Sequence, residues 1–302
     1  DVTGMLQDAA RHGEKHPLFV LVGTGGTRES LDGIDLLGTY DAPRVVVDGD
    51  RIEESVAEAV DVAVATPEVT ASVLGATVAA YVNEDVRDDV AHLPAVSYWE
   101  DTPEAYVDLA ADSAYDADDL STLREAIALE AYYQSYNGKR ELVEDLFWET
   151  DNRALAAHVA GQFRSKLADE LDTANPHVER HEVGDVRVDV LDAAAHTHRF
   201  EFPPTGVLLD ARHRDAREET DGPLVTLCVD TDELHVRSTE AVDIRTVGER
   251  VAEACPEAGV RALGGKDGHV AYLAGEEKAV LTAAIETVAD LATDRVEASA
   301  GE

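Results

Sequence analysis

Apolar runs of strand length and segments of helical spacing alternate along the first part of the chain. Leu18–Val22 is a short apolar run and Arg44–Val47 is predicted as a second strand, and the segment 28–40 between them places Leu31, Ile34 and Leu37 on one side of a helix. Strand, helix and strand with short connections form a right-handed parallel crossover in nearly all proteins, so we expect a parallel sheet. The apolar runs are continuous, which predicts strands covered on both faces.

Helices are expected to dominate the middle of the chain. The pattern predicts a helix over Ile52–Val60, a short strand over Asp61–Ala65, a helix over 66–81 with Pro67 near its first turn, and helices through most of 103–171. The segment 66–81 is almost entirely small and apolar, so we expect that helix to be buried.

From about Val183 onward strands become more frequent. Val186–Leu191 alternates like a half-buried strand, and 196–206 is predicted as a strand that leads into a Pro-Pro turn. Two further strands should flank a hairpin turn at Asp230–Asp232. The remaining predicted elements are helices over 242–254 and 276–292, a Gly-rich turn over 261–268 and a strand over 270–273.

These elements predict an α/β protein in three parts. A parallel-sheet domain would cover residues 1–115, a helical connector 116–180, and a smaller mixed α/β domain 181–302. We expect a cleft between the two α/β domains.

Charge is the feature of the composition that changes this picture most. The chain carries 63 acidic and 25 basic residues and a formal net charge of -38, while its 44% hydrophobic content is ordinary for a globular protein. Such a charge repels itself strongly in dilute buffer, and molar salt would screen it to within about 3 Å. We therefore predict a halophilic, archaeal protein. No basic patch stands out, but at molar salt this argues neither for nor against nucleic-acid binding.

Cysteine and histidine spacing disfavours a structural metal site. Cys228 and Cys255 lie far apart without CxxC spacing. His196, His198 and His213 have a spacing that suits zinc poorly, so structural roles are expected. The sequence has no signal peptide and no apolar run of membrane length, which predicts a cytoplasmic protein without a membrane partner.

The residues that follow the first two predicted strands carry the main functional signal. Gly23-Thr24-Gly25-Gly26-Thr27 follows one strand, and Asp48-Gly49-Asp50 follows the next. This arrangement resembles the second and third motifs of the DHH phosphoesterase superfamily, whose best-known nuclease is RecJ. The resemblance implies an Asp after the first strand and Asp-His-His after the second. Here Gly23 stands in place of that Asp, and Gly49 and Asp50 replace the two His.

The second half of the chain extends the resemblance. Arg237-Ser238 after a strand, followed by a helix and by Gly264-Gly265-Lys266-Asp267-Gly268-His269, resembles the DHH-associated C-terminal domain, and 197–206 is similar to archaeal RecJ-like proteins. The resemblance implies a nucleic-acid or phosphate site formed by Arg237, Ser238, Gly264, Gly265, Gly268 and His269. Glycine backbone N–H groups and a guanidinium suit an anion. An ordinary Gly-rich turn is the alternative.

Metal ligands are scarce where the resemblance would place them. A two-metal phosphoesterase needs several carboxylates and imidazoles around ions about 3.5–4 Å apart. Asp48 remains, Asp101 resembles the Asp of the fourth motif, and Asp50 is a third vestigial carboxylate; no catalytic residue is assigned. A strand that carries the first motif is not recognised before Leu18 and could lie outside the sequence. We therefore expect no cofactor, with Mn or Mg at Asp48 and Asp101 only if the protein is active.

By resemblance, the chain is predicted to be a catalytically degenerate RecJ-like scaffold or non-catalytic subunit in DNA replication or repair. Its expected partners are an active RecJ-like paralogue or GINS, with single-stranded DNA as a further partner. Two alternatives stay open. One is an active metal-dependent single-strand exonuclease or phosphoesterase, and the other is a nucleotide-binding regulatory module in which Gly23–Thr27 holds a phosphate at a helix N-terminus. A dinucleotide-binding unit is disfavoured because its third Gly would fall at Arg28.

Overall fold

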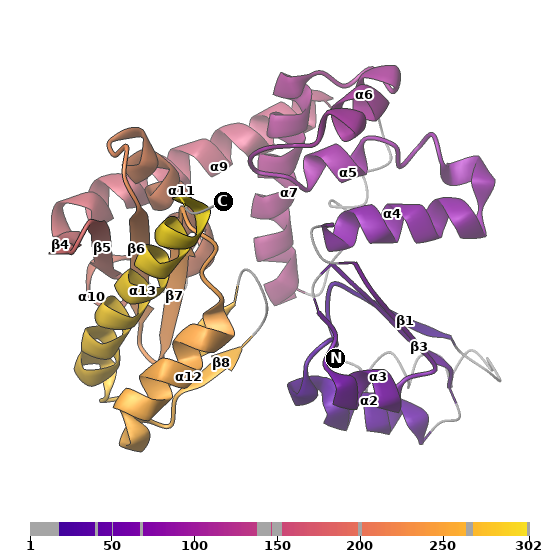
Figure 1. The fold of residues 1–302 in the computed structure, drawn as a ribbon. Coiled ribbons are helices and arrows are strands. Elements are labelled where there is room, and N and C mark those ends of the chain that lie inside the picture. The colour runs from indigo at the N-terminus through magenta and orange to yellow at the C-terminus, as the bar shows by residue number, and fades with distance from the viewer. Residues whose placement is uncertain are drawn as a thin grey trace. The chain divides into compact units, whose positions relative to one another are not determined.

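The computed structural model describes residues 18–39, 42–49, 51–66, 69–137, 146, 153–198, 201–263 and 268–300. The chain divides into two compact units, Asp1–Ala131 with Gly138–Ala160, and Tyr132–Asn137 with Gly161–Glu302. Each unit has its own sheet (Figure 1), and the predicted combination of parallel sheet, helical segment and mixed α/β part is confirmed. The division into three domains stays a prediction. Across the described ranges, none of the helices has the length and apolar content needed to span a membrane.

The first unit begins with a parallel sheet of strand order β1-β2-β3 and continues in helices. Its elements are β1 (Phe19–Val22), α2 (Leu31–Gly38), β2 (Arg44–Asp48), α3 (Glu54–Ala59), β3 (Val62–Ala65), α4 (Ala71–Val82), α5 (Leu93–Val96), α6 (Glu104–Asp112) and α7 (Ala117–Asn137), with 3-10 turns at Arg28–Ser30 and Glu84–Val86. The register places Leu21 beside Val46 and Val46 beside Ala63. The predicted parallel pairing is therefore confirmed.

The two faces of this sheet are covered unequally. On one face Val46 packs with Ile34 of α2 and Val56 of α3. The opposite face carries six valines, Val20, Val22, Val45, Val47, Val62 and Val64. Helix α4 packs there against β1 and β2 (Figure 1), but Val62 on β3 remains 48% exposed. The expectation of full cover on both faces is thus wrong for β1 and β3, because α4 covers only part of the valine face.

Helix α4 is also less buried than its apolar composition predicts. Thr70 caps its start by accepting a hydrogen bond from the Val73 N–H at 3.3 Å, so the helix begins later than expected. Within α4, Val73 is buried, whereas Tyr81 is 90% exposed. A helix that is apolar all round has no single stripe to direct toward a core, so the sequence does not reveal which face packs.

A buried histidine stabilises the helical part of the first unit. The His92 ring is 2% exposed and stacks on Tyr115 with 4.3 Å between ring centroids, and its Nε2 has no hydrogen-bond partner among the described residues. Burial lowers the pKa of His92 to about 4 from an ordinary value of 6.5. The unfolded chain therefore binds this proton first as the pH falls. The stability that neutral His92 provides is complete above pH 6.5 and is lost as the pH falls toward about 4.

We expect His92→Phe, which keeps a stacked ring without a titrating nitrogen, to reduce this pH dependence. The free energy of unfolding of the parent should fall by up to about 3 kcal/mol more than that of the variant across this pH range. Urea titrations at fixed molar KCl measure the difference, and His181→Gln in an exposed strand is the control. Identical pH profiles for the parent and His92→Phe would contradict the assignment.

The second unit is built on a six-stranded mixed sheet of order β4-β5-β6-β7-β9-β8, in which β5 and β6 are parallel and the other neighbours antiparallel. Helix α9 (Arg153–Ala174) and the turn Asn175–His177 precede the sheet. The following elements are β4 (Glu179–Val183), β5 (Val186–Asp192), α10 (Ala193–His196), α11 (Thr205–Glu218), β6 (Leu224–Asp230), β7 (Glu233–Ser238), α12 (Ile244–Ala254), a 3-10 turn at Pro256–Ala258, β8 (Arg261–Leu263), β9 (His269–Ala271) and α13 (Glu277–Ala300).

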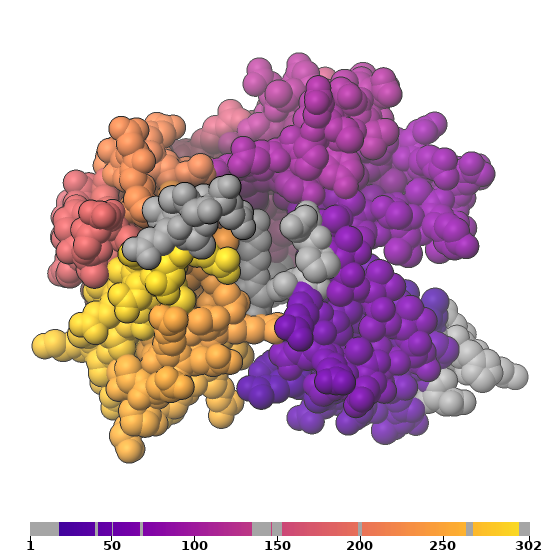
Figure 2. Space-filling model, in the orientation of Figure 1, coloured from indigo at the N-terminus to yellow at the C-terminus, as the bar shows by residue number. Residues whose placement is uncertain are grey.

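Helices cover both faces of this sheet. Helices α12 (orange) and α13 (yellow) lie on the side seen in Figures 1 and 2, over a core that includes Val188, Leu227 and Val247. On the other face, Leu209 of α11 packs near Cys228. Strand β5 is therefore buried along both faces up to its last residue, and the prediction of a half-buried strand is wrong. The predicted hairpin between β6 and β7 is confirmed.

The segment 196–206 differs most from its prediction. Asp192 ends β5 and accepts a hydrogen bond from the Ala195 N–H at 3.0 Å, which starts the short helix α10 instead of a strand. The described residues after α10 are irregular until α11 begins at Thr205. Strand β4 was not predicted, and β8 occupies the start of the segment expected to be a Gly-rich turn.

Gly161 offers a simple test of helix propensity in α9. It is exposed, and a Cβ built at this position would have no atom within 4 Å. Because glycine loses more backbone entropy than alanine in a helix, we expect Gly161→Ala to raise the free energy of unfolding by about 0.5–1 kcal/mol. Denaturant titration measures the change, and a loss of stability would contradict the described environment.

Candidate functional site

The carboxyl ends of β1 and β2 hold the residues that the resemblance singles out. Gly23 follows β1, donates its N–H to the Val47 carbonyl at 2.9 Å and has a φ of +65°. A Cβ at Gly23 would lie 2.6 Å from the Ala71 Cβ. The start of α4 therefore leaves no room beside Gly23 for a larger side chain without movement of the helix.

The backbone after β3 closes even more tightly on Gly49. A Cβ at Gly49 would lie 1.9 Å from the Val69 carbonyl oxygen and 3.1 Å from the Ala71 nitrogen. The Thr66 N–H also donates to the Asp48 carbonyl at 3.1 Å, which ties this connection to the end of β2. An imidazole at position 49 could not be accommodated in this backbone. Asp50, the other position of the His pair, lies outside the described residues.

Asp48 and Asp101 do not form a metal centre with other described side chains. The Asp48 carboxylate lies against the Gly loop, because a Cβ at Gly26 would be 3.0 Å from its Oδ2. Asp101 is exposed in the loop after α5, with a φ of 50°. Within the part of the chain that the structure describes, no three His, Cys, Asp or Glu side chains are grouped so that they could hold a metal ion. The described residues therefore do not fit a two-metal centre.

The position of Asp48 also bears on the nucleotide-binding alternative. A phosphate bound at Gly23–Thr27 would approach a carboxylate that already lies against Gly26. Two anions in contact repel each other unless a cation lies between them. This arrangement disfavours phosphate binding at the loop.

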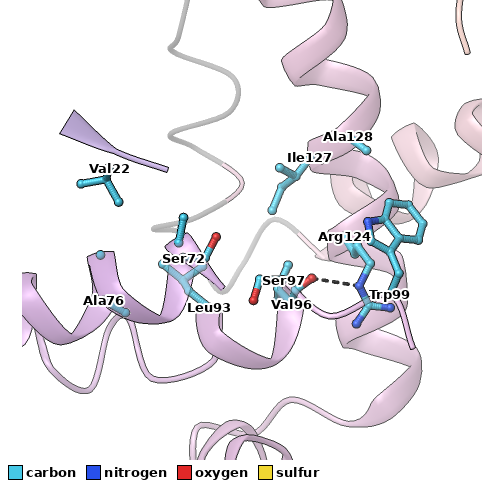
Figure 3. Close-up of a pocket in the computed structure, with 12 residues that line it drawn as sticks. Val22, Ser72, Ala76, Leu93, Val96, Ser97, Trp99, Arg124, Ile127 and Ala128 are labelled. Atoms are coloured by element: carbon cyan, nitrogen blue, oxygen red, sulfur yellow. Dashed lines mark hydrogen bonds between the residues drawn. The ribbon is translucent and has the colours of Figure 1, made fainter. Parts of the chain in front are cut away.

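A hollow in the first unit opens beside the end of β1, and we call it the α4–α7 pocket (Figure 3). It has a volume of about 490 Å³. Its walls come from Val22, Ala71, Ser72, Gly75, Ala76, Leu93, Val96, Ser97, Trp99, Arg124, Ile127 and Ala128. The lining is mainly apolar, with two serine hydroxyls and one guanidinium.

In the second unit the structure brings Arg237 and His269 to one face of the sheet. Arg237 and His235 are two residues apart on β7, and His235 pairs directly with His269 on β9. The two imidazoles stack with 5.2 Å between ring centroids. Glu233 lies 3.2 Å from His235 Nε2 and 3.7 Å from His269 Nε2. Burial and the adjacent His269 lower the pKa of His235.

Of the other predicted phosphate-binding residues, Ser238 directly follows Arg237 on β7 and so points to the opposite face of the sheet. Arg237 donates from Nε to the Asp210 carboxylate of α11 and from Nη1 to its neighbour's carbonyl at 2.9 Å. Ser238 ends β7 and its Oγ accepts from the Glu240 N–H at 3.2 Å. Gly268 is buried, whereas Gly264 and Gly265 lie outside the described residues. An anion at the Arg237 face would compete with the Asp210 carboxylate for that guanidinium and would be repelled by the Glu233 carboxylate.

A buried ionic network joins α11 to the same sheet. Asp189 of β5 accepts hydrogen bonds from Arg187 Nε at 2.7 Å, Arg187 Nη2 at 2.6 Å and Arg212 Nη2 at 2.9 Å. The hydrogen bond to Asp189 is the main cause that raises the pKa of Arg187. Both guanidiniums are mostly buried, so their charges depend on Asp189 for compensation.

The histidines that were weighed as metal ligands have other contacts. His213 is buried against Thr226 at 2.8 Å, and burial lowers its pKa to about 4. The buried Glu170 is hydrogen-bonded to His198, with its Oε2 2.7 Å from Nδ1. His196 stacks on His177 with 4.0 Å between centroids. Cys228 and Cys255 are free thiols.

Sequence reasoning missed several residues that the fold brings to these places. Glu233, His235 and Arg237 stand at every second position of β7. The period-two spacing of a predicted strand could therefore have placed all three on one face. Trp99 and Arg124 come from segments far apart in the chain, and the Arg124 guanidinium carbon lies 5.7 Å from the Trp99 ring centroid. No local pattern indicates that pairing.

Comparisons with known proteins relate the chain to one group of folds. No protein-family model matches. The solved DHH domain of a member of the s1p family of ribosomal proteins superimposes with a TM-score of 0.85 and 28% identity, covering 95% of this chain and 73% of that one. RecJ from Thermus thermophilus, solved in complex with Mn²⁺, has a TM-score of 0.46 and 16% identity, covering 96% and 54%.

One curated relative matches by sequence. An uncharacterized protein of Methanocaldococcus jannaschii is 24% identical over 302 residues, which cover 85% of this chain. The match spans 40% of the length of that relative.

Proposed function

This chain has the fold of the DHH phosphoesterase superfamily, and from that premise we propose that it is a catalytically degenerate member with a non-catalytic role. Its role would be that of a scaffold or subunit in DNA replication or repair. The partners we propose are an active RecJ-like paralogue or GINS. Halophilic, archaeal origin is part of the same proposal and rests on the net charge of -38.

The contact at Gly49 is the observation that carries the proposal. In the superfamily pattern that the sequence resembles, this position belongs to a His of the metal site. Here the Val69 carbonyl would lie 1.9 Å from the first side-chain atom. Non-bonded carbon and oxygen atoms repel strongly at that distance, so the backbone itself excludes an imidazole. The connection from β3 to α4 has taken the space that a ligand would need.

The carboxylates that remain give a second line of support. Two divalent ions a few ångströms apart require several anionic or imidazole ligands to replace their water. Asp48 lies against the Gly loop and Asp101 is exposed after α5. Neither belongs to a described group of three potential ligands. This ligand set supports loss of hydrolysis with retention of the fold.

The second unit supports a retained role in binding. Arg237 and His269 share a sheet face with His235, which supports the nucleic-acid or phosphate site that the resemblance to the DHH-associated domain implies. We propose that Arg237, Ser238, Gly264, Gly265, Gly268 and His269 contact single-stranded DNA. Asp210 and Glu233 partly neutralise this face, which favours weak binding over tight binding.

Reconstitution with purified partners tests the scaffold role. We expect the protein to co-elute with an active RecJ-like paralogue or with GINS in size-exclusion chromatography with light scattering at molar KCl. An acidic protein of unrelated fold is the matched control for non-specific association. Elution of the protein alone, in the presence of both candidates, would rule out the proposed partnership.

A further inference from the structure

The α4–α7 pocket takes no part in the function proposed above, and its walls have an unusual composition. Small residues form the wall on α4, namely Ala71, Ser72, Gly75 and Ala76. Ala128 and Ile127 come from α7 on the other side (Figure 3). A helix face of small side chains is nearly flat because few atoms project from it. Such walls fit a flat group better than a branched one.

Trp99 and Arg124 supply the pocket's stacking surface. The indole is 39% exposed, and the Arg124 guanidinium carbon lies 5.7 Å from its ring centroid. Arg124 also donates from Nε to the Val96 carbonyl at 2.8 Å and from Nη2 to the Ala95 carbonyl at 3.2 Å. These hydrogen bonds hold the guanidinium in place beside the ring. Aromatic rings and guanidinium planes are the groups on which proteins stack unpaired bases.

The Ser97 hydroxyl at the pocket already has partners within the protein. Ser97 donates to the Pro94 carbonyl at 2.7 Å, and its Oγ lies 2.7 Å from Thr70 Oγ1. A ligand in the pocket would therefore be held by contact and stacking rather than by hydrogen bonds to Ser97. The favoured ligand is thus a flat ring held by stacking.

We propose that the α4–α7 pocket binds one unpaired nucleobase by stacking, without reading its edges. The volume of about 490 Å³ lies within the range of small-molecule sites. Val22 at the end of β1 forms part of the wall, and α/β sheets bind their ligands at this end of the strands. The site does not depend on the scaffold role or on hydrolysis.

Binding of adenosine to the whole protein at molar KCl, measured by calorimetry, tests the proposal. Gly75→Leu fills the pocket, whereas Gly75→Ala is its matched control, because a Cβ there would make an ordinary 3.5 Å contact with Val22 Cγ1. Trp99→Leu removes the ring from a partly exposed position. We expect Trp99→Leu to weaken binding roughly tenfold or more, Gly75→Leu to abolish it, and Gly75→Ala to change it by less than about threefold.

Two further probes separate the possible sources of the ring. If a deoxyadenosine oligonucleotide displaces adenosine, the pocket binds a base within a nucleic-acid chain. If it does not displace adenosine, the pocket binds a free nucleoside. Both outcomes support the proposal. Circular dichroism confirms that each variant is folded. Adenosine binding that is absent in the parent, or unchanged by both Trp99→Leu and Gly75→Leu, overturns the proposal. Preferential binding of N-acetyl-leucinamide also overturns it and indicates a protein side chain as the occupant.

Discussion

Replacing Asp189 with leucine is expected to lower the free energy of unfolding of the second unit by about 3–5 kcal/mol. The Asp189 side chain is 0% exposed and accepts hydrogen bonds from both Arg187 and Arg212. Without the carboxylate, two mostly buried guanidiniums would keep their charge and lose their main compensating partner. Leucine has the same branching as aspartate and is larger, so the loss would not come from a cavity.

Denaturant titration of the second unit's transition at constant molar KCl measures this effect. Glu219→Gln is the matched control, since Glu219 also contacts Arg187, at 3.5 Å, but its side chain is 59% exposed. We expect that variant to change stability by less than about 1 kcal/mol. If Asp189→Leu were no more harmful than Glu219→Gln, the buried network would not have the role described here.

The second large effect is expected from Gly49→His, which places at position 49 the residue of the superfamily pattern that the sequence resembles. The Cβ alone would lie 1.9 Å from the Val69 carbonyl oxygen. Relief requires the connection between β3 and α4 to move, which should cost about 3 kcal/mol or more of the first unit's stability. The introduced imidazole should not produce manganese binding, because the described residues around it do not form a ligand set.

Gly33→His is the matched control for this variant. Gly33 lies on α2, and a Cβ there would have nothing within 4 Å. Thermal unfolding and manganese titration of both variants separate the contact at position 49 from a general effect of histidine. Normal stability together with tight manganese binding by Gly49→His would show that the backbone at Val69 leaves room for an imidazole at position 49, which would contradict the prediction.

The first unit was largely predictable because its strands are encoded locally. Apolar runs at Leu18–Val22 and Arg44–Val47, separated by a helix-length segment, permit only a few arrangements, and the parallel pairing followed. How far helices cover the two faces of this sheet could not be predicted from the sequence. Whether α4 covers Val62 depends on how far the helix extends over the sheet, and its uniformly apolar sequence leaves that undetermined.

The sequence predicted which residues occupy the candidate site, but it did not predict what surrounds them. The sequence indicates that glycines stand at 23 and 49 where ligands are expected, but the closeness of Val69 to Gly49 is a tertiary contact. Arg237 and His269 could be named by resemblance, yet the contacts of Arg237 with Asp210 and of His269 with Glu233 depend on the packing of α11 and β9. Asp192 is a further case, because its side chain caps the short helix α10 at the place where the sequence predicted the start of a strand.

Phosphodiester hydrolysis is the measurement that tests the central claim most directly. The purified protein is incubated with single-stranded DNA and Mn²⁺ at molar KCl, beside its Asp48→Asn variant and a protein-free blank. We expect that neither protein releases nucleotides above the blank. Manganese-dependent release by the parent that disappears in Asp48→Asn would contradict this expectation.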